Sequence, residues 1–193
     1  IKYSKYNGEL WTEITSLEKI ISQNSIDFIK EVPQIHSTRE GYKKLGKEPS
    51  RYRPSAEALF RRIIQGKSIY QISNLVDTIN LCSLLTGYSI GGYDEKKICG
   101  DIVFDKGDSQ TQYQAIGRGI MNIENLPVFY DEIGAFGSPT SDSERTKISE
   151  NTDLILLVVL NFGGHNNLSN DLNLMCEKFE KYCDAKNMLT EII

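Results

Sequence analysis

The spacing of apolar positions changes near the middle of the chain. From residue 10 to residue 87, apolar side chains recur every three or four positions, which is the period of an amphipathic helix. This period predicts helices over residues 8–22, 54–66 and 73–86. From residue 90 the period shortens, and apolar residues alternate or run together between clusters of Gly and Asp. The pattern therefore predicts helices first and strands second.

Two of the predicted helices have recognisable ends. Pro54 and Ser55 begin the second helix and Gly66 ends it, which follows the preference for Pro at the start of a helix and Gly after its end. The third helix begins at a cap, Ser73 or the next residue, and ends at Gly87. This third helix is apolar around most of its circumference, so we expect it to be buried.

Four stretches in the second half predict strands, namely residues 99–107, 112–119, 126–134 and 154–162. The last of them, LILLVVLNF, is apolar on both faces and is therefore expected at the centre of its sheet. Residues 168–183 return to a helical period. Helices, strands and a closing helix predict one α+β domain over residues 1–193, with the second and third helices packed side by side on a mostly antiparallel or mixed sheet.

The composition is that of a globular protein, with no pattern that indicates a disulfide framework or a membrane anchor. The formal net charge of −4 gives no broad attraction to polyanions, so nucleic acid would need a local basic patch or a bound end. The longest apolar run, residues 154–160, is too short to cross a bilayer, and no targeting segment opens the chain. We therefore expect a cytoplasmic protein whose scattered cysteines are reduced, namely Cys82, Cys99, Cys176 and Cys183.

Motifs for cofactors and metals are missing from the sequence. His36 and His165 are isolated, and their spacing to the cysteines matches no metal site. A phosphate-binding loop, a dinucleotide fingerprint and a nucleophile elbow are all lacking. We therefore expect neither metal nor cofactor.

Two stretches resemble one known family. Residues 52–104 contain the helix motif NLVDTIN followed by Asp94, and residues 130–162 contain a glycine-rich loop, hydroxyl residues and an apolar strand. Together they resemble the B3/B4 domain of the bacterial phenylalanyl-tRNA synthetase beta subunit. The resemblance covers most of residues 50–162 and implies the α+β fold of that domain.

The resemblance also implies a function. In the synthetase this domain binds the acylated 3′ end of a mischarged tRNA and hydrolyses the aminoacyl ester. The sequence shows no aminoacylation or anticodon-binding module, so the chain resembles a free-standing editing domain that acts in trans on aminoacyl-tRNA. A separate hydrolytic site is physically sensible, since binding alone discriminates poorly between near-isosteric side chains. The alternative is a non-catalytic module that binds an amino acid, an aminoacyl-tRNA end or another small polar ligand.

The chain departs from the family at three polar positions. Ile79 stands where the family has Thr, and Gly91 stands where it has an important His. Arg145 falls near the position of an acidic residue, beside an insertion of several residues. The identity of the amino acid that the family edits therefore does not transfer to this chain.

The insertion lies in a stretch, GAFGSPTSDSERT over residues 134–146, that gathers polar side chains. One interpretation is a solvated hairpin loop whose side chains cap a turn. The other is a rebuilt pocket, in which Asp142 or Glu144 orients a water and Thr146 with nearby backbone amides faces the oxyanion. The substrate would be held by Asn80, Gly91, Gly137, Ser138, Thr140, Ser141, Ser143 and Arg145. In this second case the stretch should converge with the helix end carrying Asn80 and with residues 90–93.

Two further groups carry alternatives. Asp77 and Asn80 lie three residues apart on the apolar third helix, where they form either a helix-to-strand hydrogen-bond clamp that fixes the fold or, for Asn80, the floor of a pocket. The densest basic group is either a solvated face or a contact for RNA phosphates. It consists of Arg51, Arg53, Arg61 and Arg62.

Overall fold

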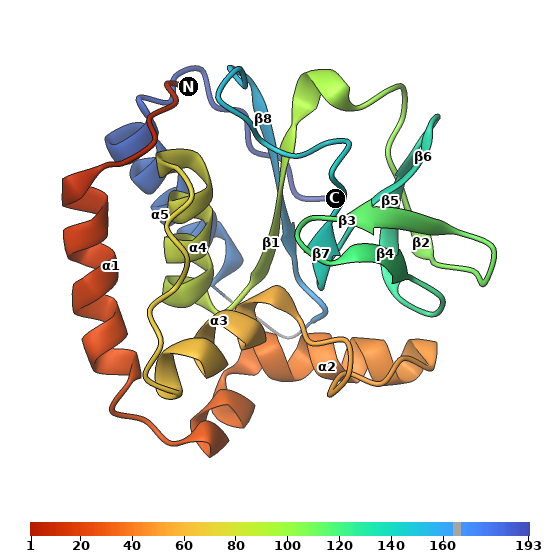
Figure 1. The fold of residues 1–193 in the computed structure, drawn as a ribbon, viewed down its shortest axis with the longest axis horizontal. Coiled ribbons are helices and arrows are strands. Elements are labelled where there is room, and N and C mark those ends of the chain that lie inside the picture. The colour runs from red at the N-terminus through yellow and green to blue at the C-terminus, as the bar shows by residue number, and fades with distance from the viewer. Residues whose placement is uncertain (164–166) are drawn as a thin grey trace.

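The computed structural model describes residues 1–163 and 167–193 and has an α+β architecture. In Figure 1 most helices lie on one side, the strands β2 to β7 lie on the other, and the ribbon of β1 and β8 runs between them. Helix α2 runs beneath the strand-rich part. The expected order of helices, strands and a closing helix is confirmed. The expectation about His165 lies outside the described residues.

The helices form where the helical period indicates, with one addition. Ser73 caps α4 through its side chain, which accepts from the backbone N–H of Val76 at 3.4 Å, and Gly87 ends the helix in the left-handed conformation at φ 80°. Helix α3 contacts α4, as expected. The helices are α1 (Gly8–Ile21), α2 (Pro33–Leu45), α3 (Ser55–Ile64), α4 (Asn74–Thr86) and α5 (Leu168–Cys183), with short 3₁₀ turns at Ile26–Glu31 and Glu95–Lys97.

Helix α2 is the helix that the sequence pattern did not predict. Its sequence is mostly polar, and its buried side chains include Tyr42 and Thr38. Two local signals are nevertheless present, because Pro33 is the first residue of the helix and Gly46 ends it at φ 87°. The mean hydropathy of this segment is too low for a core helix, so the signals at its two ends did not lead to a predicted helix.

Within residues 1–163 and 167–193 the strands form three antiparallel sheets in place of the one that we expected. The pairs β1–β8 and β3–β4 are two-stranded, and the larger sheet has the order β2-β5-β6-β7. The strands are β1 (Ser89–Asp94), β2 (Val103–Lys106), β3 (Gln112–Ala115), β4 (Gly119–Asn122), β5 (Pro127–Asp131), β6 (Gly134–Ser138), β7 (Ser141–Asp142) and β8 (Ile155–Leu160).

The prediction that residues 154–162 form a central strand is wrong. Strand β8 pairs with β1 alone, with Ser89 opposite Leu160 and Asp94 opposite Ile155. Both faces of β8 are nevertheless covered, because alternate side chains pack on two different clusters. Leu157 and its neighbours on one face join the helical core, while Leu156 and Val158 join the cluster of Tyr93, Phe129, Phe136 and Leu160. The apolar residues on both faces of β8 therefore indicate that both faces are covered by other side chains, and not that β8 has a strand on each side.

The cysteines and the apolar segments agree with the composition. All four cysteines are free thiols, of which Cys82 and Cys183 are buried and Cys99 is exposed. Burial raises the pKa of the Cys82 thiol to about 12. No helix in residues 1–163 and 167–193 is long and apolar enough to cross a membrane.

Candidate functional site

The polar stretch over residues 134–146 is a buried hairpin and not an exposed loop. Strands β6 and β7 pair antiparallel, with Gly137 opposite Asp142 and Ser138 opposite Ser141. The Ser138 hydroxyl accepts from the backbone N–H of Ser141 at 3.3 Å, which closes the turn. Ser138, Thr140, Ser143 and Thr146 are all buried. The solvated-loop interpretation is therefore wrong, although the turn chemistry it invoked is present.

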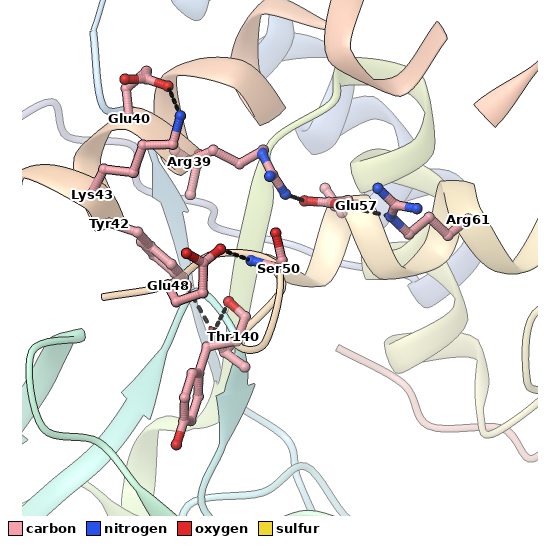
Figure 2. Close-up of polar contacts among 12 residues, drawn as sticks. Arg39, Glu40, Tyr42, Lys43, Glu48, Ser50, Glu57, Arg61 and Thr140 are labelled. Atoms are coloured by element: carbon pink, nitrogen blue, oxygen red, sulfur yellow. Dashed lines mark hydrogen bonds and ion pairs between the residues drawn. The ribbon is translucent and has the colours of Figure 1, made fainter. Parts of the chain in front are cut away.

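Three tyrosines from different elements reach the hairpin. The Tyr42 hydroxyl of α2 lies 2.8 Å from Thr140 Oγ1, a contact drawn in Figure 2. The Tyr113 hydroxyl of β3 donates to the Ser141 carbonyl at 2.6 Å and lies 3.0 Å from Ser138 Oγ. The Tyr93 hydroxyl of β1 donates to Asp142 Oδ1 at 2.7 Å. The polar side chains of the hairpin thus find their partners among phenols and not in bulk water.

Asp142 is the carboxyl group at the centre of this arrangement. Burial raises its pKa to about 7, against the opposing effect of hydrogen bonds from the Tyr93 hydroxyl and the Gly92 backbone. Asp142 and Ser141 as whole residues are only partly buried, unlike their neighbours in the hairpin. A carboxyl group with a pKa near 7 and a hydroxyl hydrogen bond is a candidate for proton transfer.

Tyr93 occupies a slot between two glycines. A methyl group at Gly91 or at Gly137 would overlap the Tyr93 hydroxyl and ring. The ring is fully buried and packs edge-on against Phe136, with ring centroids 5.0 Å apart. A methyl group at Gly92 would likewise overlap the side chain of Ile79. Two of the three positions at which the sequence departs from the family pattern thus meet at this strand, since Gly91 belongs to β1 and Ile79 packs against it.

The expected convergence on residues 90–93 is present. Besides the Tyr93–Asp142 hydrogen bond, the backbone N–H of Asp94 donates to the Thr146 carbonyl at 2.9 Å, and Tyr93 forms a bridge with Lys147. The Thr146 hydroxyl is completely buried and has no hydrogen-bond partner in the part of the chain that the structure describes. A buried hydroxyl without a hydrogen bond lowers the free energy of unfolding by about 1 to 3 kcal/mol, so Thr146 is a candidate for a functional group.

Asp77 forms a hydrogen-bond clamp, but to a helix and a loop and not to a strand as the structural alternative proposed. Its carboxylate accepts from the Trp11 indole at 2.8 Å and from the Ile72 backbone at 2.9 Å, tying α4 to the start of the chain. Burial raises the pKa of this carboxyl group. Asn80 is half-buried, and the hydrogen bonds of the hairpin's described residues do not include it.

Two other predicted site residues have partners away from Asp142. Glu144 pairs with Lys147 at 2.5 Å, and this hydrogen bond lowers the pKa of Glu144. Arg145 is bidentate to Asp131, with Nη2 at 2.8 Å from Oδ1 and Nη1 at 2.9 Å from Oδ2. Arg145 thus ties the hairpin to the turn after β5.

Replacing Arg145 by Met should lower the free energy of unfolding at pH 7 by about 2 kcal/mol, since the completely buried Asp131 carboxylate loses its counter-ion. Burial alone raises the pKa of Asp131, but Arg145 and three backbone N–H groups hold it below its usual value. A lowered pKa stabilises the fold above about pH 4 and loses this contribution as the pH falls. Urea unfolding should therefore show a smaller loss at pH 3 than at pH 7.

The matched control for this prediction is Arg118→Met. Arg118 is exposed and forms no salt bridge with the described residues, so the change should alter stability by less than about 0.5 kcal/mol. An equal loss at both pH values would show that Arg145 acts only through packing.

The predicted basic group is larger than the sequence indicated, and some of its members are engaged. Residues 33–62 carry eight Lys and Arg against three Glu, in a chain whose net charge is −4. Figure 2 shows the buried Glu57 carboxylate held between Arg39 and Arg61, with both distances 2.7 Å. Arg62 lies over the Tyr70 ring at 3.8 Å and donates to the Ser68 carbonyl. Arg51 and Arg53 are exposed.

The three tyrosines and Arg39 were missed by reasoning from the sequence. A tyrosine reads as a core residue until its hydroxyl partner is known. One signal was available for Tyr93, because a strand over residues 89–94 places it on the same face as Gly91, where an aromatic ring covers the glycine. Arg39 could have been found through Glu57, since a carboxylate on the apolar face of α3 needs a cation.

Comparisons with known proteins give one family and a distant structural likeness. A sequence profile of the B3/4 domain matches residues 37–191. No curated protein sequence matches the chain. The fold is similar to an N-terminal fragment of the phenylalanyl-tRNA synthetase beta subunit from Pyrococcus horikoshii, with 18% identity and a TM-score of 0.48. The match covers 56% of this chain and 40% of that fragment.

Proposed function

The chain belongs to the B3/4 domain family, and we propose that it binds the aminoacylated 3′ end of a tRNA and hydrolyses the ester in trans. The substrate class is a tRNA that carries the wrong amino acid. The site is the hairpin of β6 and β7 together with β1. The relation to the synthetase module supports ester hydrolysis as the reaction. The residues around Asp142 support the hairpin and β1 as its site.

The observation that carries this proposal is the Asp142 carboxyl group, whose pKa of about 7 suits a general base. Its carboxylate takes a proton from a water as the water oxygen bonds to the ester carbonyl carbon. The bond between that carbon and the ribose oxygen then breaks, and the proton passes to the ribose oxygen. Tyr93 orients the carboxylate through its hydroxyl.

The remaining predicted residues take supporting roles in this proposal. Backbone amides near Gly137 and Ser138 and the Thr146 hydroxyl donate hydrogen bonds to the oxyanion. Because Thr146 is buried, the hairpin must move for its hydroxyl to reach the substrate. Ser141 and Thr140 line the path by which the substrate reaches Asp142. Glu144 is the alternative general base. Asn80, Gly91 and Ser143 contact the amino acid or the terminal phosphate, while Arg145 holds the hairpin in place through Asp131. The exposed Arg51 and Arg53, with Arg61 and Arg62, contact the acceptor end.

A second candidate is a binding module without hydrolysis, and one observation favours it. The Tyr93 ring already fills the slot between Gly91 and Gly137, and its hydroxyl already engages Asp142. A domain that holds its site closed in this way would bind a small polar ligand at the hairpin surface and release it unchanged.

The test is deacylation of a panel of tRNAs, each charged with a non-cognate amino acid, by the wild-type chain at pH 8. Release of free amino acid at least tenfold above buffer for one tRNA supports the hydrolase. Rates equal to buffer across the panel, with saturable binding of the same tRNAs, exclude the hydrolase and favour the binding module.

A further inference from the structure

A concave site lies beside the strand-rich part, and no residue of the β6–β7 hairpin contributes to its lining. It is a cavity of about 610 Å³ between one face of α2 and the edge strand β2, which we call the α2–β2 cavity. This volume is in the range that holds a small-molecule ligand. None of the residues assigned to the proposed hydrolysis contributes to its wall.

One wall of the α2–β2 cavity is an aromatic ring held in place. Phe104 is 47% exposed, which is unusual for a ring of this size. Its inner face stacks on the buried Phe129, with centroids 4.5 Å apart and planes 28° apart. Antiparallel pairing sets Phe104 opposite Phe129 on the same face of the sheet, which keeps the two rings side by side. An exposed ring backed by a second ring is a platform on which a planar group can stack.

Two ammonium groups beside the ring have no counter-ion. Lys44 on α2 and Lys106 on β2 line the cavity, and neither forms a salt bridge with any described residue. The lining also holds two carboxylates. Glu40 pairs with Lys43 at 2.7 Å, so a lysine outside the lining compensates its charge. Asp105 accepts from the Lys106 backbone N–H at 2.6 Å, which leaves its negative charge in place. Two lysines against this one uncompensated carboxylate leave a net positive charge for a ligand.

A stacking surface next to free cations matches the chemistry of a nucleotide. We propose that the α2–β2 cavity binds one nucleotide of a single-stranded RNA, with the base on Phe104 and the phosphate between Lys44 and Lys106. Lys43 and Arg39 lie further along α2 and are paired with Glu40 and Glu57, so adjacent phosphates would compete with these carboxylates for them. The choice of RNA over a free nucleotide rests on the proposed function.

The test is equilibrium binding of a fluorescein-labelled single-stranded oligoribonucleotide, followed by anisotropy at several salt concentrations. Phe104→Leu should weaken binding about tenfold at every salt concentration, because a stacked base is lost. The double variant Lys44→Gln, Lys106→Gln should weaken binding and reduce the slope of log affinity against log salt by roughly 0.7 per phosphate lost. Lys67→Gln, an exposed lysine away from the cavity, is the matched control and should leave both unchanged.

Adenosine monophosphate as a competitor separates the two sources of the same chemistry. If adenosine monophosphate displaces the RNA only at concentrations far above that of the RNA, the result supports an RNA strand as the ligand. If it displaces the RNA at a similar concentration, the cavity is a site for a free nucleotide and the choice of RNA is overturned. Wild-type affinity in both cavity variants overturns the nucleotide site itself. These results do not depend on hydrolysis, so a negative deacylation panel with Phe104-dependent binding would refute the hydrolase and leave this site standing.

Discussion

Replacing Asp142 by Asn is expected to lower the rate of aminoacyl-ester hydrolysis by about 100-fold at pH 8, which is at the low end of what a general base contributes. Asn keeps the size of the side chain and an oxygen that accepts from the Tyr93 hydroxyl, but it takes no proton from water. The wild-type rate should rise with pH and level off above about pH 7, where the carboxyl group is ionised. The rate of the variant should lack this rise.

The control for Asp142→Asn is Glu150→Gln, which makes the same change of charge at an exposed carboxylate. It should leave the rate and the pH profile unaltered. A variant rate within twofold of the wild type would remove Asp142 from the mechanism and leave Glu144 as the alternative base.

The same variant gives an independent check of the raised pKa through stability. A carboxyl group with a raised pKa binds its proton more tightly in the folded chain, so its contribution to stability is present at low pH and is lost as the pH rises from about 4 to 7. The melting temperature of Asp142→Asn should therefore rise relative to wild type between pH 5 and pH 8. An unchanging difference over this range would mean that Asp142 titrates like a carboxyl group in water.

Replacing Gly137 by Ala is expected to lower the free energy of unfolding by about 2 to 4 kcal/mol, or the melting temperature by about 10 °C. The added methyl group would overlap the hydroxyl and ring of Tyr93, which is fully buried and cannot move aside. Relief of this overlap requires loss of the hydrogen bond to Asp142. Thermal melting followed by circular dichroism measures the change.

A matched control and a double-mutant cycle test the cause of that loss. A methyl group at Gly8 would meet its nearest atom, in Tyr6, at 3.6 Å, so Gly8→Ala should be neutral or slightly stabilising in helix α1. Tyr93→Phe removes the atom that the methyl group meets first, and the double variant should lose less stability than the sum of the two single variants. Additive losses would place the damage elsewhere in the hairpin.

Much of the secondary structure could be predicted from local sequence. The period of the apolar residues, Ser73 as a cap and Gly87 as a terminator placed α4 within one residue, because these signals act over a few positions of the chain. The four strand segments each contain an observed strand. Strands β1, β4, β6 and β7 were not predicted. For β6 and β7 the reason is that a hairpin made of Gly, Ser and Thr has the composition of a loop.

The candidate site could be predicted only in part. The sequence marked Asp142 and the hydroxyl residues around it, since a polar insertion between apolar strands needs partners when it is buried. It did not indicate that those partners are Tyr42, Tyr93 and Tyr113, which lie 98, 49 and 25 to 28 positions away from the groups they contact. It also assigned Arg145 to a ligand, whereas the folded chain pairs it with Asp131.

The sequence alone determined the class of fold, the succession of helices, strands and a closing helix, and the presence of a basic group between Arg51 and Arg62 in an otherwise acidic chain. Tertiary structure alone decided that β8 has one strand beside it, that Tyr93 lies between Gly91 and Gly137, and that Asp142 titrates near neutral pH. The physical reason is range. Helix periods, caps and net charge are sums over neighbouring residues, whereas strand partners, burial and pKa values depend on groups that only the completed fold brings within a few ångströms.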